Sequence, residues 1–513
     1  MLSLWTDTSA LALSDFLPAA HHQPVASCVV DLCQALEALR FDSHRQEEID
    51  SELDPSALSK LFSAGLFKLT VPQEHGGMGA SLRDFAVTME LTGQLGPAWA
   101  MTAVPHLCIS VKAVTRYCSF EVREQIFRAL SDESTLLAFA ITEDQGSDVA
   151  AMRTRLHTSA SGKFLLSGHK QWITNLKRAS HVVVAALCPD LHPAPNASVL
   201  ILVELAKSGI SISHPWRKTC VNGSDTAGIF FDQLEIEPEQ ILTAPGQGMN
   251  AFLEMVQAGR LGTAAAAIGL ARCGVEVAGS ETRAVLNQTS VQQLEAMLDA
   301  ATAGIRLCAS FGDAQHADFP HIVSILKNTT AQIAQTVLQD IDHAYAIQGR
   351  KLPASIAHSR DALGLFCLLK GPGEILAWQT VLTWSALVLK ELDHKPDWPP
   401  ELQRAASCLA FQITQLRQDG SPSQQPPAVM HIATGLGYWW LLFSCHYLFE
   451  DGACRLTAAS RLRARDWAQQ AFLRWEKESV ESSFGLQAEQ INTLYQQAKS
   501  ARDNLFQRRM ECE

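Results

Sequence analysis

Residues 138–175, AFAITEDQGSDVAAMRTRLHTSASGKFLLSGHKQWITN, form the stretch that decides the fold of this chain. An apolar run at 138–142 ends in Thr-Glu, and a Gly-Ser-Asp turn follows it at 146–148. Residues 164–174 alternate apolar and polar side chains, which is typical of a half-buried strand. The stretch therefore predicts two strands that are separated by a polar turn.

The same stretch places hydroxyl groups beside two large aromatic rings. Thr142, Ser147 and Thr174 supply the hydroxyls, and Phe139 and Trp172 supply the rings. Such a set can hydrogen-bond the edge of a flat heterocycle while the rings cover its face. A hairpin with ordinary turn residues is the simpler explanation of the composition alone.

Two motifs in the stretch resemble those of the acyl-CoA dehydrogenase family. Residues 142–148, Thr-Glu-Asp-Gln-Gly-Ser-Asp, are similar to the family signature Thr-Glu-x-x-x-Gly-Ser-Asp with one residue deleted. Residues 168–175, Gly-His-Lys-Gln-Trp-Ile-Thr-Asn, are similar to the family block Gly-x-Lys-x-Trp-Ile-Thr-Asn. The motifs follow one another in the family's order and spacing, so the chain is identified from its sequence as a member of this family.

The period of the apolar residues changes twice along the chain, from helical to two-residue and back to helical. It predicts a mainly α fold with an inserted β domain. The resemblance implies an N-terminal α-helical domain, a middle β barrel or sandwich and a C-terminal four-helix bundle, followed here by extra C-terminal helices. The predicted limits of these four parts are residues 1–135, 136–245, 246–390 and 391–513.

Individual elements follow from the same periodicity. An Asp-Pro pair at 54–55 is a typical helix start, and Ala and Gly on one face of residues 251–279 favour close helix packing. The predicted helices are residues 56–67, 84–95, 98–117, 251–279, 290–312, 320–349, 404–416, 432–447, 453–475 and 488–508. The predicted strands are residues 136–141, 164–174, 181–187, 198–204, 210–214 and 228–236.

Composition narrows the classes of partner. The net charge of −12 without clustered basic residues argues against nucleic acid and anionic membranes. The 13 cysteines show no Cys-x-x-Cys spacing, so we expect reduced thiols and no metal site. Apolar runs at 375–389 and 435–449 are too short to span a bilayer, and the N-terminus has no secretory or mitochondrial signal pattern. A cytoplasmic protein without a transmembrane segment is expected.

The resemblance implies FAD as cofactor and α,β-dehydrogenation of an acyl thioester, carried by CoA or by an acyl carrier protein. Residues in the quoted stretch would then contact the flavin or its pyrophosphate: Phe139, Ile141, Thr142 and Ser147 would line it, Trp172 would pack against it and Thr174 would donate to N5. Arg283 would meet the pyrophosphate, and Gln348 and Gly349 would lie near the adenine. Arg350 replaces a second glycine of the family pattern there and adds bulk.

The catalytic base is where the chain departs from the family. Lys370 stands where the family has its catalytic Glu. A minority of the family places the base in the first bundle helix, just before an Arg, but here Gly259 precedes Arg260. Three explanations remain open: Lys370 or Glu254 acts as an alternative base, the chemistry is altered or a related subunit supplies the carboxylate, or the protein is non-catalytic.

The resemblance also implies partners. We expect a homodimer or homotetramer that takes part in fatty acid metabolism. An electron-transfer flavoprotein or O2 would accept the electrons.

Overall fold

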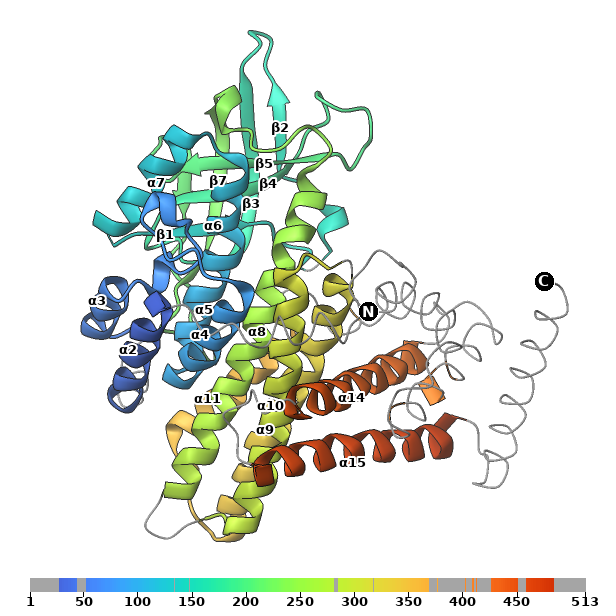
Figure 1. Cartoon of the computed structure of the whole chain (residues 1–513). Helices are drawn as coiled ribbons and strands as arrows, with labels where there is room; N and C mark the ends of the chain where they lie inside the picture. Colours follow the sequence, from blue (N-terminus) through green and yellow to red (C-terminus); the bar gives the residue numbers. More distant parts are fainter. Residues whose placement is uncertain are drawn as a thin grey trace, which may run out of the picture. The chain divides into compact units, whose positions relative to one another are not determined.

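The computed structural model describes residues 27–43, 52–132, 134–146, 148–280, 285–316, 318–368, 426–450 and 458–483, with isolated helical positions at 376, 402, 408, 409 and 412. The chain divides into two compact units, one of residues 22–372 and one of residues 373–513 with residues 1–21. Figure 1 shows the elements of both units. The division at residue 372 precedes the limit of 390 that the sequence predicts for the bundle, and the limits of the separate domains stay predictions.

Helices precede the sheet in the first unit, as the periodicity predicts. Asp54 starts one of them, because its carboxylate accepts a hydrogen bond of 2.8 Å from the Ala57 amide and Pro55 follows it. This helix ends at Ser63 instead of the expected residue 67, since Gly65 adopts a left-handed φ of 85°. The helices are α2 (Ser27–Ser43), α3 (Pro55–Ser63), α4 (Leu82–Leu95), α5 (Pro97–Pro105), α6 (Val111–Tyr117) and α7 (Phe120–Asp132).

A π-helical turn at His106–Ser110 interrupts the single helix that the sequence predicts at 98–117. His106 in this turn is completely buried. Its Nδ1 accepts a hydrogen bond of 2.9 Å from the Leu137 amide, and its Nε2 lies 2.9 Å from the Phe67 carbonyl oxygen. His106 therefore joins the helical domain to the first strand. Burial lowers the pKa of His106 to about 4, so the ring is neutral at physiological pH.

The buried His106 predicts an acid-sensitive fold. Between its folded pKa of about 4 and an unfolded pKa of about 6.5, only the unfolded chain binds this proton. The contribution of neutral His106 to the free energy of unfolding is complete above the unfolded pKa. This contribution falls by about 3 kcal/mol as the pH drops towards about 4. Urea unfolding over this pH range measures it.

His106→Gln is the control for this pH dependence. Its amide offers one acceptor and one donor without a titrating group. We expect lower stability at neutral pH but a shallower loss on acidification than in the wild type. Equal slopes in the two proteins would contradict the assignment to His106.

A seven-stranded mixed sheet follows the helices, with the path β1-β4-β2-β3-β7-β6 and with β5 paired to β4. The β1–β4 and β2–β4 pairs are parallel and the others antiparallel. The sequence missed β2, a strand of four residues with Leu156 as its one buried side chain. The strands are β1 (Leu136–Ala140), β2 (Arg155–Thr158), β3 (Phe164–Thr174), β4 (Ala179–Leu187), β5 (Ser198–Glu204), β6 (Ile210–Ile212) and β7 (Thr226–Ile236).

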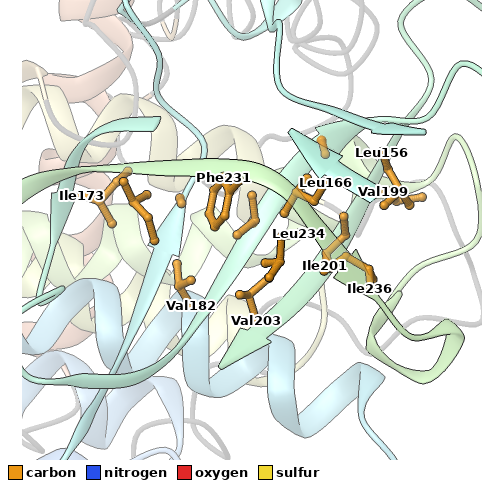
Figure 2. Packing of buried hydrophobic residues seen from close by; sticks show 14 of the residues in the cluster. Leu156, Leu166, Ile173, Val182, Val199, Ile201, Val203, Phe231, Leu234 and Ile236 are labelled. Carbon is orange, nitrogen blue, oxygen red and sulfur yellow. The ribbon is translucent and has the colours of Figure 1, made fainter. Parts of the chain in front are cut away.

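One apolar cluster fills the β domain and draws on both ends of the sheet path. Figure 2 shows Val182 from β4 and Val203 from β5 gathered with Phe231 and Leu234 from β7. Ile173 of β3 belongs to the same cluster, directly beside the site residues Trp172 and Thr174. Because strands from the whole sheet contribute to this one cluster, the β domain has a barrel-like or sandwich-like architecture.

Long helices follow the sheet in the first unit: α8 (Gly248–Ser280), α9 (Gln288–Asp313), α10 (Phe319–Ile347) and α11 (Ala354–Leu368). The first three agree closely with the predicted spans, whereas no span was predicted for α11. Asn287 starts α9, because its side-chain oxygen accepts a hydrogen bond of 2.8 Å from the Ser290 amide. Helix α8 packs on β5, α4 and α5 as well as on α9, α10 and α11, so it connects the three parts of this unit (Figure 1).

Helix α8 is apolar around most of its circumference because it is the central helix of the unit. It is long and apolar enough to cross a membrane, but 83% of its most apolar window is buried within the fold. A side chain at Gly269 would place its Cβ 1.9 Å from the Glu90 carbonyl oxygen of α4. The close approach of α4 and α8 thus requires glycine, as the Ala- and Gly-rich face predicts.

The described part of the second unit contains α14 (Pro426–Glu450) and α15 (Ala458–Ser483). Trp475 Nε1 donates a hydrogen bond of 2.8 Å to the His431 carbonyl oxygen, and the two rings stack. The predicted helices at 404–416 and 488–508 lie outside the described residues except for isolated positions. The predicted class, mainly α with an inserted β domain and extra C-terminal helices, is confirmed.

Candidate functional site

A buried ion pair supports the turn that follows β1. Lys170 Nζ lies 2.8 Å from Glu143 Oε1, and it donates a second hydrogen bond of 3.2 Å to the Ile141 carbonyl oxygen. The backbone amides of Arg153 and Thr154 donate to the two carboxylate oxygens at 2.7 and 2.9 Å. The end of β1 is thereby fixed against β3.

Both members of this pair are charged at neutral pH. Burial opposes the charge of Glu143, but Lys170 and the Thr154 amide outweigh it and hold the pKa of Glu143 at about 2. Burial lowers the pKa of Lys170 to about 8, although the Glu143 carboxylate acts in the opposite direction. A buried pair with its lone pairs satisfied in this way fixes geometry more than it adds stability.

Trp172 leaves the ladder of β3 at a bulge. The register between β3 and β7 shifts between Lys170 and Ile173, and Trp172 adopts a left-handed φ of 58°. Such a φ is rare for a bulky side chain. The indole is 57% exposed as a result, while Lys170 before it and Ile173 after it both point inward. The bulge therefore presents an aromatic face to the outside of the domain.

Thr174 and Asn175 follow at the end of the same strand. Thr174 pairs with Thr226 of β7 and is half-buried. Asn175 is fully buried with a left-handed φ of 73°, and its Nδ2 donates a hydrogen bond of 2.9 Å to the Thr102 carbonyl oxygen of α5. Asn175 thus fixes the exit of β3 against the helical domain.

Strand β1 contacts α8 through a pair of aromatic rings. The rings of Phe139, in β1, and Phe252, in α8, stack with centroids 5.4 Å apart. Ile141 and Thr142, just beyond β1, are half-buried, and the Gln171 amide donates 2.8 Å to the Thr142 carbonyl oxygen. The structure therefore brings the two sequence motifs together, because Thr142 is hydrogen-bonded to Gln171, the residue before Trp172.

These residues suit a flat heterocycle with polar edges. Trp172 offers an exposed ring, and the half-buried residues Thr142 and Thr174 carry hydroxyl groups. Holding Trp172 at a positive φ costs about 1–3 kcal/mol, and such strain concentrates at ligand sites. Ser147, the third of the predicted hydroxyl groups, lies outside the described residues.

The second group of predicted contacts lies at the far end of the bundle. Gln348 Nε2 donates 2.9 Å to the Val285 carbonyl oxygen, so the turn after α8 lies beside the end of α10. Gly349 has a left-handed φ of 64° and open space where a Cβ would be. The Arg350 guanidinium lies 5.3 Å from the centre of the Tyr345 ring. The Arg350 side chain therefore packs against α10, to which Tyr345 belongs. Arg283 lies outside the described residues.

The structure gives partial information on the candidate bases. Lys370 lies outside the described residues. Glu254 is partly exposed on α8 and forms an ion pair with Arg116 of α6. Arg260 is buried, donates 2.8 Å to Ser324 Oγ, and has its pKa lowered to about 10 by burial. The residue before Arg260 is the buried Gly259, which has no side chain, so the alternative base position of the family carries no carboxylate.

Sequence reasoning missed the role of Lys170 and Glu143, although both belong to the recognised motifs. The signal was present, because Leu166 and Lys170 share one face of β3 in a two-residue period. A lysine on an apolar face requires a buried carboxylate. Trp216, whose ring lies 4.5 Å from that of Trp172, was also missed. It belongs to neither motif, and no local pattern marked it.

Comparison with sequence families agrees with this architecture. Residues 28–134 match the acyl-CoA dehydrogenase N-terminal domain, and residues 138–234 match the acyl-CoA dehydrogenase middle domain. Human very long-chain specific acyl-CoA dehydrogenase is 32% identical over 214 residues, 40% of this chain and 33% of that protein. Probable acyl-CoA dehydrogenase YngJ of Bacillus subtilis is 25% identical over 233 residues, 45% of this chain and 61% of that protein. The matched part is less than two thirds of either relative.

Solved structures share the fold over more of the chain. An acyl-CoA dehydrogenase complexed with FAD from Bacillus anthracis superposes with a TM-score of 0.74 at 18% identity, covering 94% of this chain and 90% of that one. Butyryl-CoA dehydrogenase from Megasphaera elsdenii gives 0.61 at 18% identity, over 69% and 98%. The prolyl acyl carrier protein oxidase AnaB gives 0.59 at 16% identity, over 69% and 98%. The predicted fold, extra C-terminal helices included, is confirmed.

Proposed function

Because this chain belongs to the acyl-CoA dehydrogenase family, we propose that it binds FAD and oxidises an acyl thioester at the α and β carbons. The thioester is carried by CoA or by an acyl carrier protein. Two of the solved structures with this fold support the proposal: an acyl-CoA dehydrogenase complexed with FAD and an acyl carrier protein oxidase.

One observation carries the proposal: the strained, exposed Trp172 on the bulge of β3, fixed beside Thr142 by the Lys170–Glu143 pair. Bulky residues at positive φ are rare, and such strain clusters at ligand and active sites. FAD, when bound, would supply the hydride acceptor for this chemistry.

The residues of this chain would hold and orient the cofactor. Trp172 and Phe139 would cover a ring face, while Thr142 and Thr174 would hydrogen-bond polar atoms at the ring edge. Arg283 would pair with the pyrophosphate, and Gln348 and Gly349 would lie near the adenine. Gln348 and Gly349 follow α10, and the resemblance to the family implies that they and Arg283 would serve a second copy of the chain.

The proton-accepting group is the open part of the mechanism. Lys370 would act only in its neutral form, which needs burial among apolar neighbours to lower its pKa. Glu254 is the weaker candidate, because Arg116 already pairs with it. A non-catalytic or altered-chemistry homologue, or a subunit of a hetero-oligomer, is the second candidate function, and Lys370 at the Glu position is the observation that favours it.

The purified full-length protein should be yellow, and its flavin absorbance should bleach anaerobically with an acyl thioester. The reason is that hydride transfer from the β carbon reduces the flavin. Stopped-flow spectroscopy with acyl-CoA and acyl-carrier-protein series measures the reaction and the substrate class. Protein that carries no flavin and takes up none on addition contradicts the enzyme proposal.

Lys370→Glu and Lys370→Gln separate the two candidate functions. If Lys370 only replaced a lost base, Lys370→Glu should bleach faster than the wild type, whereas Lys370→Gln should not. Flavin binding without bleaching in any of the three proteins would favour the non-catalytic homologue.

The remaining partners are also proposals. We propose a homodimer or homotetramer, because the predicted ring contacts belong to the β domain, whereas Gln348 and Gly349, the predicted adenine contacts, follow α10. An electron-transfer flavoprotein or O2 would reoxidise the flavin in a cytoplasmic enzyme of fatty acid metabolism.

A further inference from the structure

Trp172 has an aromatic neighbour from a distant part of the sequence. Its ring centre lies 4.5 Å from that of Trp216, with the ring planes at 60°. This is an edge-to-face arrangement, which aromatic pairs favour. Trp216 lies in the segment between β6 and β7, outside both recognised motifs.

The backbone anchors Trp216 to the strand next to β3. Its amide donates a hydrogen bond of 2.9 Å to the Thr226 carbonyl oxygen, and Thr226 pairs with Thr174 in the β3–β7 ladder. Thr174 and Trp172 belong to the same strand. The two indoles are therefore held by adjacent strands, and their relative position is set by the sheet.

This contact does little for the core. Trp172 stays 57% exposed and Trp216 is only half-buried, so the pair removes little apolar surface from water. Its evident effect is to limit rotation of the Trp172 indole, whose backbone is already fixed by the bulge. One face of Trp172 remains available for a flat ligand.

We propose that Trp216 is a positioning residue for the cofactor: it holds the Trp172 indole in the orientation that receives a flat heteroaromatic ring. This inference rests on the proposed function, with FAD as the ligand. Trp216 acts through Trp172 and does not itself bind the ring.

The test is FAD titration of the flavin-free full-length protein, with Trp216→Leu, Trp216→Phe, Trp172→Ala and the double variant Trp172→Ala/Trp216→Leu. Leu is apolar and removes the aromatic edge, and because Trp216 is only half-buried we expect the fold to be preserved. We expect Trp216→Leu to bind FAD between about twofold and about tenfold more weakly. Trp216→Phe should bind nearly as the wild type, and the double variant should bind no more weakly than Trp172→Ala.

A second readout needs no ligand. The two indoles should give an exciton couplet in the far-ultraviolet circular dichroism of the flavin-free protein, and Trp172→Ala and Trp216→Leu should each abolish it. Phe230→Ala is the matched control: Phe230 is an exposed ring on β7 that stacks on His169, and its loss should leave both FAD affinity and the couplet unchanged.

Each contrary outcome is distinguishable. Wild-type affinity in Trp216→Leu overturns this inference and leaves the proposed function standing. A double variant much weaker than Trp172→Ala means that Trp216 binds the ring directly, which also overturns it. A wild-type protein that takes up no FAD overturns the proposed function and this inference together.

Discussion

Lys170→Met should destabilise the β domain by about 3–5 kcal/mol, because it leaves the Glu143 carboxylate buried without its cation. Glu143 is only 5% exposed, and the Lys170 side chain is fully buried. The amides of Arg153 and Thr154 would still donate to the carboxylate, but they do not neutralise its charge. Urea unfolding followed by fluorescence measures the loss.

The same substitution should also weaken FAD binding. Lys170 Nζ donates to the Ile141 carbonyl oxygen, so its removal frees the end of β1 from β3 beside Thr142. A control is Lys163→Met, just before the same strand, since Lys163 forms an exposed pair with Glu235. It should leave both stability and FAD affinity nearly unchanged.

Adding Glu143→Gln to Lys170→Met tests the cause. The amide oxygen of Gln still accepts hydrogen bonds but carries no charge. The double variant should recover most of the lost stability if the buried charge is responsible. A double variant as unstable as Lys170→Met would instead assign the loss to packing of the lysine stem.

Arg272→Met is the second large effect that we expect, again about 3–5 kcal/mol. Arg272 of α8 lies between two carboxylates, with Nε 2.7 Å from Glu90 Oε1 of α4 and a terminal nitrogen 3.0 Å from Asp299 Oδ1 of α9. Burial opposes the charge of Arg272, but Glu90 and Asp299 keep its pKa above the ordinary value. Without the cation, two largely buried carboxylates would face each other.

The neutral triple variant Glu90→Gln/Arg272→Met/Asp299→Asn is the control. It removes all three charges, so it should be much more stable than Arg272→Met alone. Thermal unfolding followed by the loss of helical circular dichroism compares the stabilities of the triple variant and Arg272→Met. If the triple variant is as unstable as the single one, helix packing around Arg272 matters more than charge.

The sequence predicted the helices and strands of the first unit well where the pattern is local. β3 and β5 begin and end at the predicted residues, since β3 alternates apolar and polar side chains and the apolar run of β5 is bounded by Ser198 and Glu204. β2 was missed because its four residues give too short a pattern. The predicted helix at 98–117 is helical throughout, but no local pattern predicted the π turn at His106–Ser110, where the His106 side chain contacts Phe67 and Leu137.

The sequence by itself determined the family resemblance and the order of helices, sheet and helices, and it predicted the half of the candidate site with Thr142, Trp172 and Thr174. Motifs and periodicity are local, so one chain suffices to read them. Only the tertiary structure decided that Trp172 turns outward at a bulge, that Lys170 turns inward to Glu143, and that Trp216 meets Trp172. The reason is physical: a buried charge or a strained residue is tolerated only where distant parts of the chain compensate it, and no local pattern records that compensation.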